Sequence, residues 1–122
     1  MQNAINWFEI PSVDFDRAVQ FYSDILGQPL RKSEFMGVPH GFFASDEKGV
    51  GGAIVKSDNH QISTSGAVIY LNAAGDMDGI LSRVESAGGQ IVTPKTPIGE
   101  QGYLALMLDS EGNKIGLHQP SG

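Results

Sequence analysis

The feature that most constrains the fold is an internal repeat, in which a capped helix and a later turn recur in the same order. A shift of 62 positions places Asp14 on Asp76. A shift of 63 positions places Asp46 on Asp109, so the two copies differ by a single residue of loop. Recurrence at a fixed period is the signature of one supersecondary unit used twice. The sequence therefore predicts two similar units.

Each copy is expected to contain one amphipathic helix. In the first copy, Asp14 can accept backbone N–H bonds as the N-cap, and Gly27 can take the left-handed position after the last turn. In the second copy, Asp76 is the expected cap and Gly88-Gly89 the expected stop. Apolar residues follow the i, i+3, i+4, i+7 pattern of a helix with one buried face: Phe15, Ala18, Val19, Tyr22, Ile25 and Leu26 in the first, and Met77, Ile80, Leu81, Val84 and Ala87 in the second.

Strand patterns surround both helices in the order βαβββ. They fall near residues 5–10, 28–34, 41–45 and 51–56 in the first copy and 67–72, 90–93, 103–108 and 114–118 in the second. The polar segment Ser57–Ser65 separates the copies as a linker. We expect one domain over 1–122, with units at 1–56 and 66–122 and a linker at 57–65. The segment Pro94–Gly102 is expected to form a loop at the rim of the site.

Composition narrows the classes of function. The 122-residue chain is 40% hydrophobic and carries a net charge of -6, with a pI near 4.8. Its eight basic residues are scattered, which argues against nucleic acid and against an anionic membrane surface as partners. Without cysteine, the chain has no disulfide and no thiolate nucleophile or metal ligand. No apolar run near the N-terminus resembles a signal peptide, and a cytoplasmic location is expected.

Two motifs at the right separation resemble those of a known superfamily. Val13-Asp14-Phe15-Asp16-Arg17-Ala18, followed by Phe21-Tyr22 and Leu26-Gly27, resembles the start of a vicinal oxygen chelate protein. The segment 108–115, Leu-Asp-Ser-Glu-Gly-Asn-Lys-Ile, resembles the turn into the last strand of that family. The family is also called the glyoxalase/bleomycin resistance/dioxygenase superfamily. The resemblance covers nearly the whole chain and implies an α+β fold: two βαβββ modules form curved half-sheets around a central cleft, with helices outside.

The same resemblance implies four metal-ligand positions, and none carries a ligand here. They fall on Trp7, on Val68 or Ile69, on Gly116 and on Ala53. Divalent cations need imidazole, carboxylate or other oxygen donors. Glu9 and His118 lie two residues beyond lost positions, but two ligands are too few for a tight zinc site. His40 and His60 could complete such a site only through a chance of loop geometry. We therefore expect no metal and no cofactor.

Strand alternation predicts which side chains line the cleft. Phe8 and Ile10 suit the helix side of the first strand, which leaves Trp7 and Glu9 toward the cleft. In the second copy, Ile69 and Leu71 suit the helix side. The cleft then receives three polar or aromatic side chains from the second copy, namely Tyr70, Asn72 and His118. This mixture of flat apolar walls and polar groups is typical of a small-molecule pocket. Alternatively, Trp7 fills the cleft as a plug.

Three functions follow from these residues. The leading hypothesis is a metal-independent protein that binds a small aromatic or cationic ligand, with Trp7 and Tyr70 stacking on it and Glu9 attracting positive charge. Asn72 and His118 would supply further polar contacts. The alternative is a lyase or isomerase related to lactoylglutathione lyase, or a relative of the ring-cleaving dioxygenases. In the lyase or isomerase, Glu9 acts as general base, with a pKa raised by burial, and His118 as acid. The third is an interaction module with a vestigial cleft.

A homodimer is expected in preference to a monomer, because the concave faces and edge strands need cover.

Overall fold

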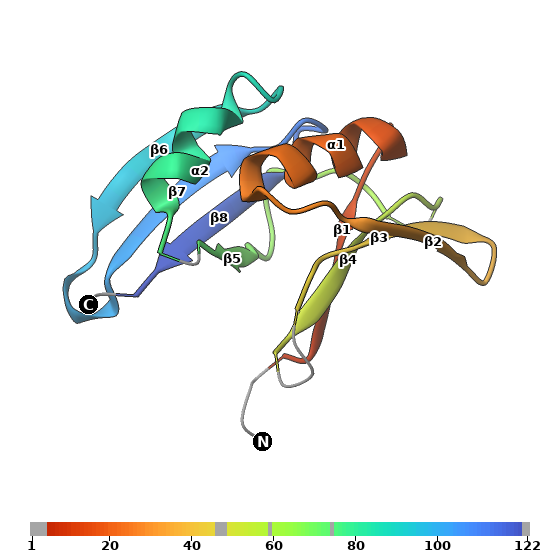
Figure 1. Cartoon of the computed structure of the whole chain (residues 1–122), viewed down its shortest axis with the longest axis horizontal. Helices are drawn as coiled ribbons and strands as arrows, with labels where there is room; N and C mark the ends of the chain where they lie inside the picture. The colour runs from red at the N-terminus through yellow and green to blue at the C-terminus, as the bar shows by residue number, and fades with distance from the viewer. Residues whose placement is uncertain (1–4, 46–48, 59, 74, 121–122) are drawn as a thin grey trace.

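The computed structural model describes residues 5–45, 49–58, 60–73 and 75–120, and contains the βαβββ unit twice (Figure 1). The first unit consists of β1 (Trp7–Pro11), α1 (Phe15–Leu26), β2 (Arg31–Phe35), β3 (Val38–Phe42) and β4 (Gly51–Val55). The second consists of β5 (Tyr70–Asn72), α2 (Met77–Val84), β6 (Gln90–Pro97), the 3-10 helix η1 (Gly99–Gln101), β7 (Tyr103–Leu108) and β8 (Lys114–Gln119). The two similar units expected from the repeat and the α+β fold implied by the family resemblance are both confirmed. None of the helices in the described ranges is long and apolar enough to cross a membrane.

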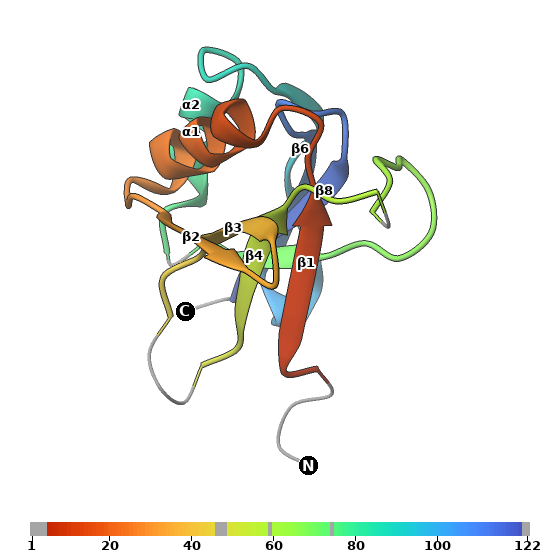
Figure 2. The ribbon, with the colours of Figure 1, turned by 90° about the vertical axis from the view of Figure 1, so that its right-hand side faces the viewer.

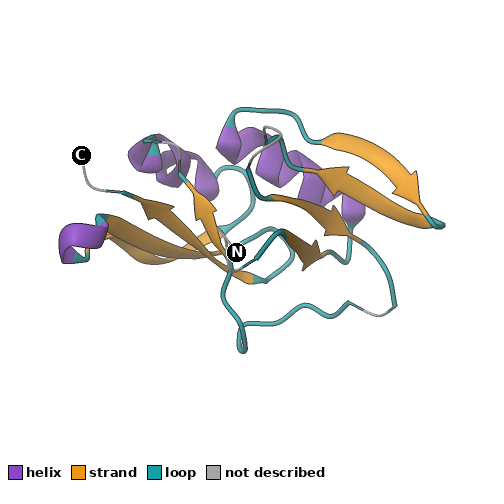
Figure 3. Cartoon of the chain, turned by 90° about the horizontal axis from the view of Figure 1, so that it is seen from below, coloured by secondary structure: helices purple, strands orange, loops and turns teal. Residues whose placement is uncertain are grey.

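Each unit builds one four-stranded sheet. The strand orders are β1-β4-β3-β2 and β5-β8-β7-β6, and within each sheet only the first pair is parallel. Both helices lie over the same side of the two sheets (Figures 1 and 3). Ile10 and Leu71 are buried in the core against the helices, and Phe8 and Ile69 pack on that core. The faces predicted for β1 and β5 are therefore correct, and each sheet presents its other face away from the helices.

The boundaries of α1 follow the sequence closely, whereas α2 ends at Val84, before the predicted stop at Gly88-Gly89, and the two N-termini differ. Asp14 caps α1 by accepting a bond from the Arg17 backbone N–H at 3.1 Å, and Gly27 ends the helix with φ +70°. The same role predicted for Asp76 is wrong, because its side chain makes no cap bond. Its carboxylate accepts instead from Arg83 at 3.2 Å. The Gln119 side chain accepts from the first amide of α2, that of Met77, at 3.0 Å, so this N–H is satisfied without Asp76.

Two strand predictions are shifted. The strand expected at 41–45 lies at Val38–Phe42, because Met36 and Gly37 form a two-residue hairpin between paired residues Phe35 and Val38. Both turn residues have positive φ, at 52° and 79°, which suits the twist of a tight hairpin. Strand β6 extends to Pro97 through two irregularities of register. The expected rim loop at Pro94–Gly102 is thus mostly strand and 3-10 helix, since prolines are tolerated where pairing is irregular.

A buried hydrogen bond joins the two units. Tyr22 on α1 is fully buried, and its hydroxyl donates to Asp109 Oδ2 at 2.7 Å. Asp109 begins the turn before β8, and its other oxygen accepts from the backbone amides of Glu111 and Asn113, both at 2.9 Å. Burial, together with the Asp109 carboxylate, raises the pKa of Tyr22 well above its ordinary value, so the hydroxyl remains a donor.

Two other residues of that turn, Glu111 and Asn113, form hydrogen bonds with the β1–α1 connection of the first unit. The Asn113 side-chain amide donates to the Pro11 carbonyl at 2.8 Å. Glu111 accepts from the backbone amides of Val13 and Asp14 and pairs with Arg17 Nε at 2.7 Å. Partial burial acts to raise the pKa of Glu111, but the bonds from Arg17 and the backbone outweigh it and the pKa is lowered. The turn of the second unit therefore fixes the β1–α1 connection of the first.

We expect Tyr22→Phe to destabilise the protein by about 1–3 kcal/mol, because it leaves a buried carboxylate oxygen with one donor fewer. Urea unfolding followed by circular dichroism measures the change. Tyr70→Phe is the matched control, since Tyr70 is 46% exposed. Equal stability of the two variants would contradict a role for the Tyr22 hydroxyl in joining the units.

Candidate ligand site

The open face of the first sheet is the face turned away from α1. Register pairs Trp7 with Gly51 and Glu9 with Ala53, so these residues share a face. On the next strand, Phe42 lies opposite Ala53. Ala53 is fully buried yet lies outside the main hydrophobic core, so the larger side chains of this open face cover it. Trp7 and Glu9 therefore lie together, as predicted.

An aromatic row crosses this face from β1 to β2. The Trp7 and Phe42 ring centroids are 6.1 Å apart with planes at 56°. Phe42 stacks on His40 with centroids 5.5 Å apart and planes at 23°, and His40 meets Phe35 in a T-shaped contact at 5.8 Å. The guanidinium carbon of Arg31 lies 4.7 Å from the centre of the Phe42 ring, which is cation–π geometry.

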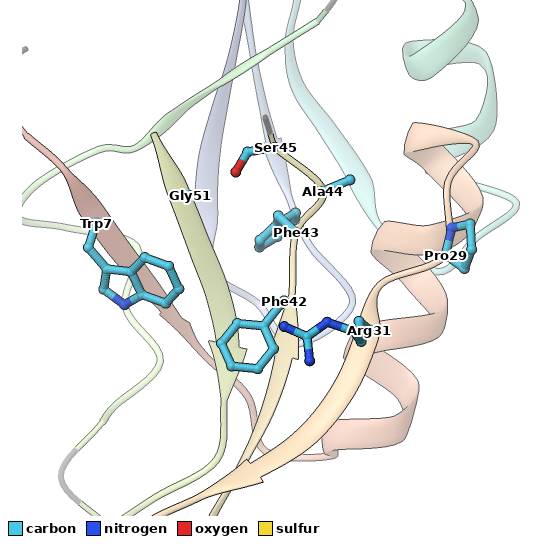
Figure 4. Close-up of a pocket in the computed structure, with 8 residues that line it drawn as sticks. All are labelled: Trp7, Pro29, Arg31, Phe42, Phe43, Ala44, Ser45 and Gly51. Carbon is cyan, nitrogen blue, oxygen red and sulfur yellow. The ribbon is translucent and has the colours of Figure 1, made fainter. Parts of the chain in front are cut away.

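A pocket of about 390 Å³ opens at the Trp7 end of this row (Figure 4). Its size is that of small-molecule sites, which span about 300–1,000 Å³. A Cβ atom on Gly51 would lie 3.2 Å from Trp7 Cζ3, so the indole lies close over bare backbone at this position. The described part of the lining consists of Trp7, Pro29, Arg31, Phe42, Phe43, Ala44, Ser45 and Gly51, of which Arg31 alone is charged. Trp7 is 46% exposed and forms a wall of the pocket, so it is not the interior plug considered above.

Glu9 does not line this pocket, because its carboxylate has other partners. Its Oε2 accepts from the Trp7 indole N–H at 3.2 Å, and its Oε1 lies 2.8 Å from His60 Nε2. A second imidazole, that of His40, places Nε2 3.9 Å from Oε2. The hydrogen bond from His60 lowers the pKa of Glu9, against a smaller opposing effect of burial. The raised pKa predicted for Glu9 from burial is therefore wrong, because the contact with His60 reverses the shift.

His60 also bonds Ser57, so three side chains form a chain. Ser57 Oγ lies 2.6 Å from His60 Nδ1. A carboxylate can only accept, so His60 Nε2 carries the proton toward Glu9. In the neutral ring, Nδ1 then accepts from the Ser57 hydroxyl. Both Ser57 and His60 come from the linker, which passes on the β1 side of the molecule (Figure 2).

The other three predicted site residues lie on the corresponding face of the second sheet. Register pairs Tyr70 with Gly116 and Asn72 with His118. The Tyr70 ring covers Gly116 so closely that a Cβ there would clash. His118 Nε2 lies 2.8 Å from the Gln101 carbonyl oxygen. These residues are grouped together, but none of the hydrogen bonds and ring contacts of Trp7 and Glu9 in the described ranges reaches them.

The four family positions for metal ligands do not fit a cation. In the parallel strand pairs of the two units, Glu9 beside Ala53 corresponds to Tyr70 beside Gly116. Trp7, two residues before Glu9, therefore corresponds to Val68, two residues before Tyr70. The side chains at the four positions are an indole, two aliphatic groups and a hydrogen atom, none of which ligates a divalent ion. Across the residues that the structure describes, no three histidine, aspartate or glutamate side chains are grouped so that they could hold a metal ion.

Several site residues escaped the sequence analysis. Arg31 and Phe42 are neighbours only because the Met36–Gly37 hairpin sets the register of β2 on β3. The contact of His60 with Glu9 spans 51 residues and depends on the path of the linker, which has no periodic signal. Alternation within β2 could have singled out Arg31, since it puts Arg31 on the face opposite Lys32.

Comparison with known proteins agrees with this geometry. The family model of the Glyoxalase/Bleomycin resistance protein/Dioxygenase superfamily matches residues 4–117. Among curated proteins, no match was found. A glyoxalase/bleomycin resistance protein from Albidiferax ferrireducens T118 is 20% identical with a TM-score of 0.75, over 98% of this chain and 100% of that one.

Two further structures share the fold at lower identity. A family enzyme from Burkholderia phytofirmans PsJN is 13% identical with a TM-score of 0.68, over 95% of this chain and 98% of that one. A glyoxalase I mutant from Zea mays is 18% identical with a TM-score of 0.65, over 93% of this chain but only 44% of that one. At these identities the structures establish fold alone, whereas the family model spans nearly the whole sequence. The chain therefore belongs to the glyoxalase/bleomycin resistance protein/dioxygenase superfamily.

Proposed function

We propose that this protein binds a small planar organic ligand, without a metal ion, on the open face of its first sheet. The observation that carries the proposal is the pocket between Trp7, Phe42 and Arg31, whose volume is about 390 Å³. Trp7 and Phe42 meet at 56°, so a flat ring can stack on one and meet the other edge-on. A half-exposed tryptophan leaves aromatic surface that ligand binding would bury.

Removal of either aromatic wall should weaken binding. Trp7→Ala and Phe42→Ala are expected to lower affinity about tenfold or more for aromatic probes, because stacking and apolar burial are lost. Suitable probes are 2-naphthoate, 2-naphthamide and 2-naphthylmethylammonium, measured by titration calorimetry. Because Trp7 is partly exposed, Trp7→Ala should lower the free energy of unfolding by less than the about 3–5 kcal/mol lost when a fully buried aromatic is truncated.

Tyr70→Ala is the matched control for these variants, since it removes an equally exposed ring from the second sheet. We expect its affinity to match that of the wild type. If Tyr70→Ala weakens binding as much as Trp7→Ala does, the ligand spans both units, as the sequence predicts, and the single-pocket proposal is wrong. If none of the three probes binds, the proposed function fails.

Metal independence is a separate part of the proposal. It is supported by the side chains at the four family positions, Trp7, Ala53, Val68 and Gly116, which offer no ligand atoms. Purified protein should carry less than one divalent ion per chain by elemental analysis, and EDTA should leave its melting temperature unchanged. Stoichiometric nickel or zinc, or glyoxalase-type activity that appears on adding either ion, would contradict this.

A metal-free enzyme is the second candidate, and the Glu9–His60–Ser57 chain favours it. A lowered pKa makes Glu9 a weaker base, and its bond to His60 holds that imidazole in the tautomer with Nδ1 unprotonated. His60 Nδ1, rather than Glu9 or His118, would then be the base: it would take the proton of the Ser57 hydroxyl as that hydroxyl takes one from substrate. Isomerase or lyase turnover without added metal that is lost in His60→Gln and kept in His118→Gln would support an enzyme over a binding protein.

We also propose that the protein forms a homodimer. The β2–β3 hairpin leaves Phe35 60% exposed and Met36 87% exposed, and an exposed apolar hairpin tip favours burial against a second copy. Light scattering should give twice the 13.0 kDa chain mass, and Met36→Lys should shift the equilibrium toward the monomer. A mass near that of one chain for the wild-type protein would contradict the dimer.

A further inference from the structure

Among the described residues that line the pocket of the first unit, the one charged side chain is a cation, Arg31. Arg31 lies at the start of β2 on the open face of the sheet, and its guanidinium projects over the Phe42 ring toward the pocket (Figure 4). Glu9, from which the sequence predicts attraction of a cation, lies outside the lining. The local charge therefore favours an anion in a chain whose net charge is -6.

The guanidinium keeps its hydrogen-bonding capacity for a ligand. In the described part of the chain, which leaves out residues 46–48 beyond Ser45, Arg31 makes no ion pair with a carboxylate. The next residue, Lys32, pairs with Asp16 at 2.9 Å, on the helix side of the sheet. Arg31 lies over the Phe42 ring, which has no oxygen or nitrogen to accept a hydrogen bond, so the guanidinium N–H groups remain able to donate to a ligand.

The aromatic and cationic groups are arranged for one ligand to meet both. Phe42 is the shared neighbour, because it is in ring contact with Trp7 on one side and beneath Arg31 on the other. A ring stacked against Trp7 can thus carry its substituent toward Arg31. Arginine presents paired donors that match the two oxygens of a carboxylate, and such charge-assisted bonds are stronger than neutral ones.

We propose that the ligand class of this pocket is the aromatic carboxylates, with Trp7 and Phe42 holding the ring and Arg31 holding the carboxylate. This inference rests on the proposed function, since it names the ligand class of the same site. It assigns Arg31 as the residue that determines charge specificity.

The test compares the affinities of three probes. We would titrate 2-naphthoate, 2-naphthamide and 2-naphthylmethylammonium into the wild-type protein and measure each affinity by titration calorimetry. The three probes share a ring system and differ mainly in the charge of the substituent. We expect 2-naphthoate to bind about 10- to 100-fold more tightly than the amide, the range expected for hydrogen bonds to a charged group. The ammonium probe should bind most weakly.

Arg31→Gln should reduce the affinity for 2-naphthoate to that for the amide and leave the amide affinity unchanged. Arg31→Lys should recover part of the preference, since the charge returns without the paired donors. Lys32→Gln is the matched control, because it removes a neighbouring positive charge from the other face of the strand and should keep the preference for the carboxylate. Melting temperatures verify that all variants are folded.

The outcomes separate this inference from the proposed function. Equal affinities for the three probes, or a preference for 2-naphthoate that persists in Arg31→Gln, would overturn the assignment of Arg31. If the Trp7→Ala and Phe42→Ala variants still lose binding in that case, the pocket proposal survives. If the ammonium probe binds most tightly, the proposal is wrong and the cationic ligand predicted from Glu9 is supported instead. A lack of binding by any probe would overturn both.

Discussion

The structure depends on the buried contact between Tyr22 and the Asp109 turn. Each unit has one sheet and one helix, and a single unit would leave the core side of its helix half covered. The hydroxyl of Tyr22 reaches Asp109 across the unit boundary at 2.7 Å, and the same turn holds Pro11 and Arg17 through Asn113 and Glu111. These bonds fix α1 and the β1–α1 connection to the second unit. Both helices lie on one side of the two sheets, so the opposite faces are available for function.

The two open faces have diverged in chemistry while keeping the same geometry. The first sheet carries an aromatic row, Arg31 and a carboxylate bound by His60. The second carries Tyr70 over Gly116, with His118 directed to a backbone carbonyl. Neither retains the ligands with which metal-dependent members of the family are expected to bind their ion. In the function proposed here, ring stacking and one guanidinium provide the selectivity of the first pocket in place of a metal ion.

Sequence reasoning succeeds here where a pattern is local and fails where it depends on register or on a loop. The Asp14 cap, the Gly27 stop and the helix side of β1 and β5 follow from short patterns, and the structure confirms them. The hairpin at Met36–Gly37 is not predicted, because a methionine with positive φ has no sequence signal. Without this hairpin the predicted β3 is shifted and the Arg31–Phe42 contact is not foreseen. The linker has no periodic pattern, so the contact of His60 that reverses the predicted pKa shift of Glu9 is not foreseen either.

The most direct test of a binding site in the first unit is to map which residues a ligand contacts. Two-dimensional NMR of isotope-labelled protein with saturating 2-naphthoate would map perturbed resonances onto the two sheets. We expect the resonances of the Trp7 indole N–H and of the Arg31, Phe42 and Gly51 amides to shift. The amide resonances of Tyr70, Asn72 and His118 should not change. Shifts concentrated on the second sheet, or spread equally over both, would contradict a binding site confined to the first unit.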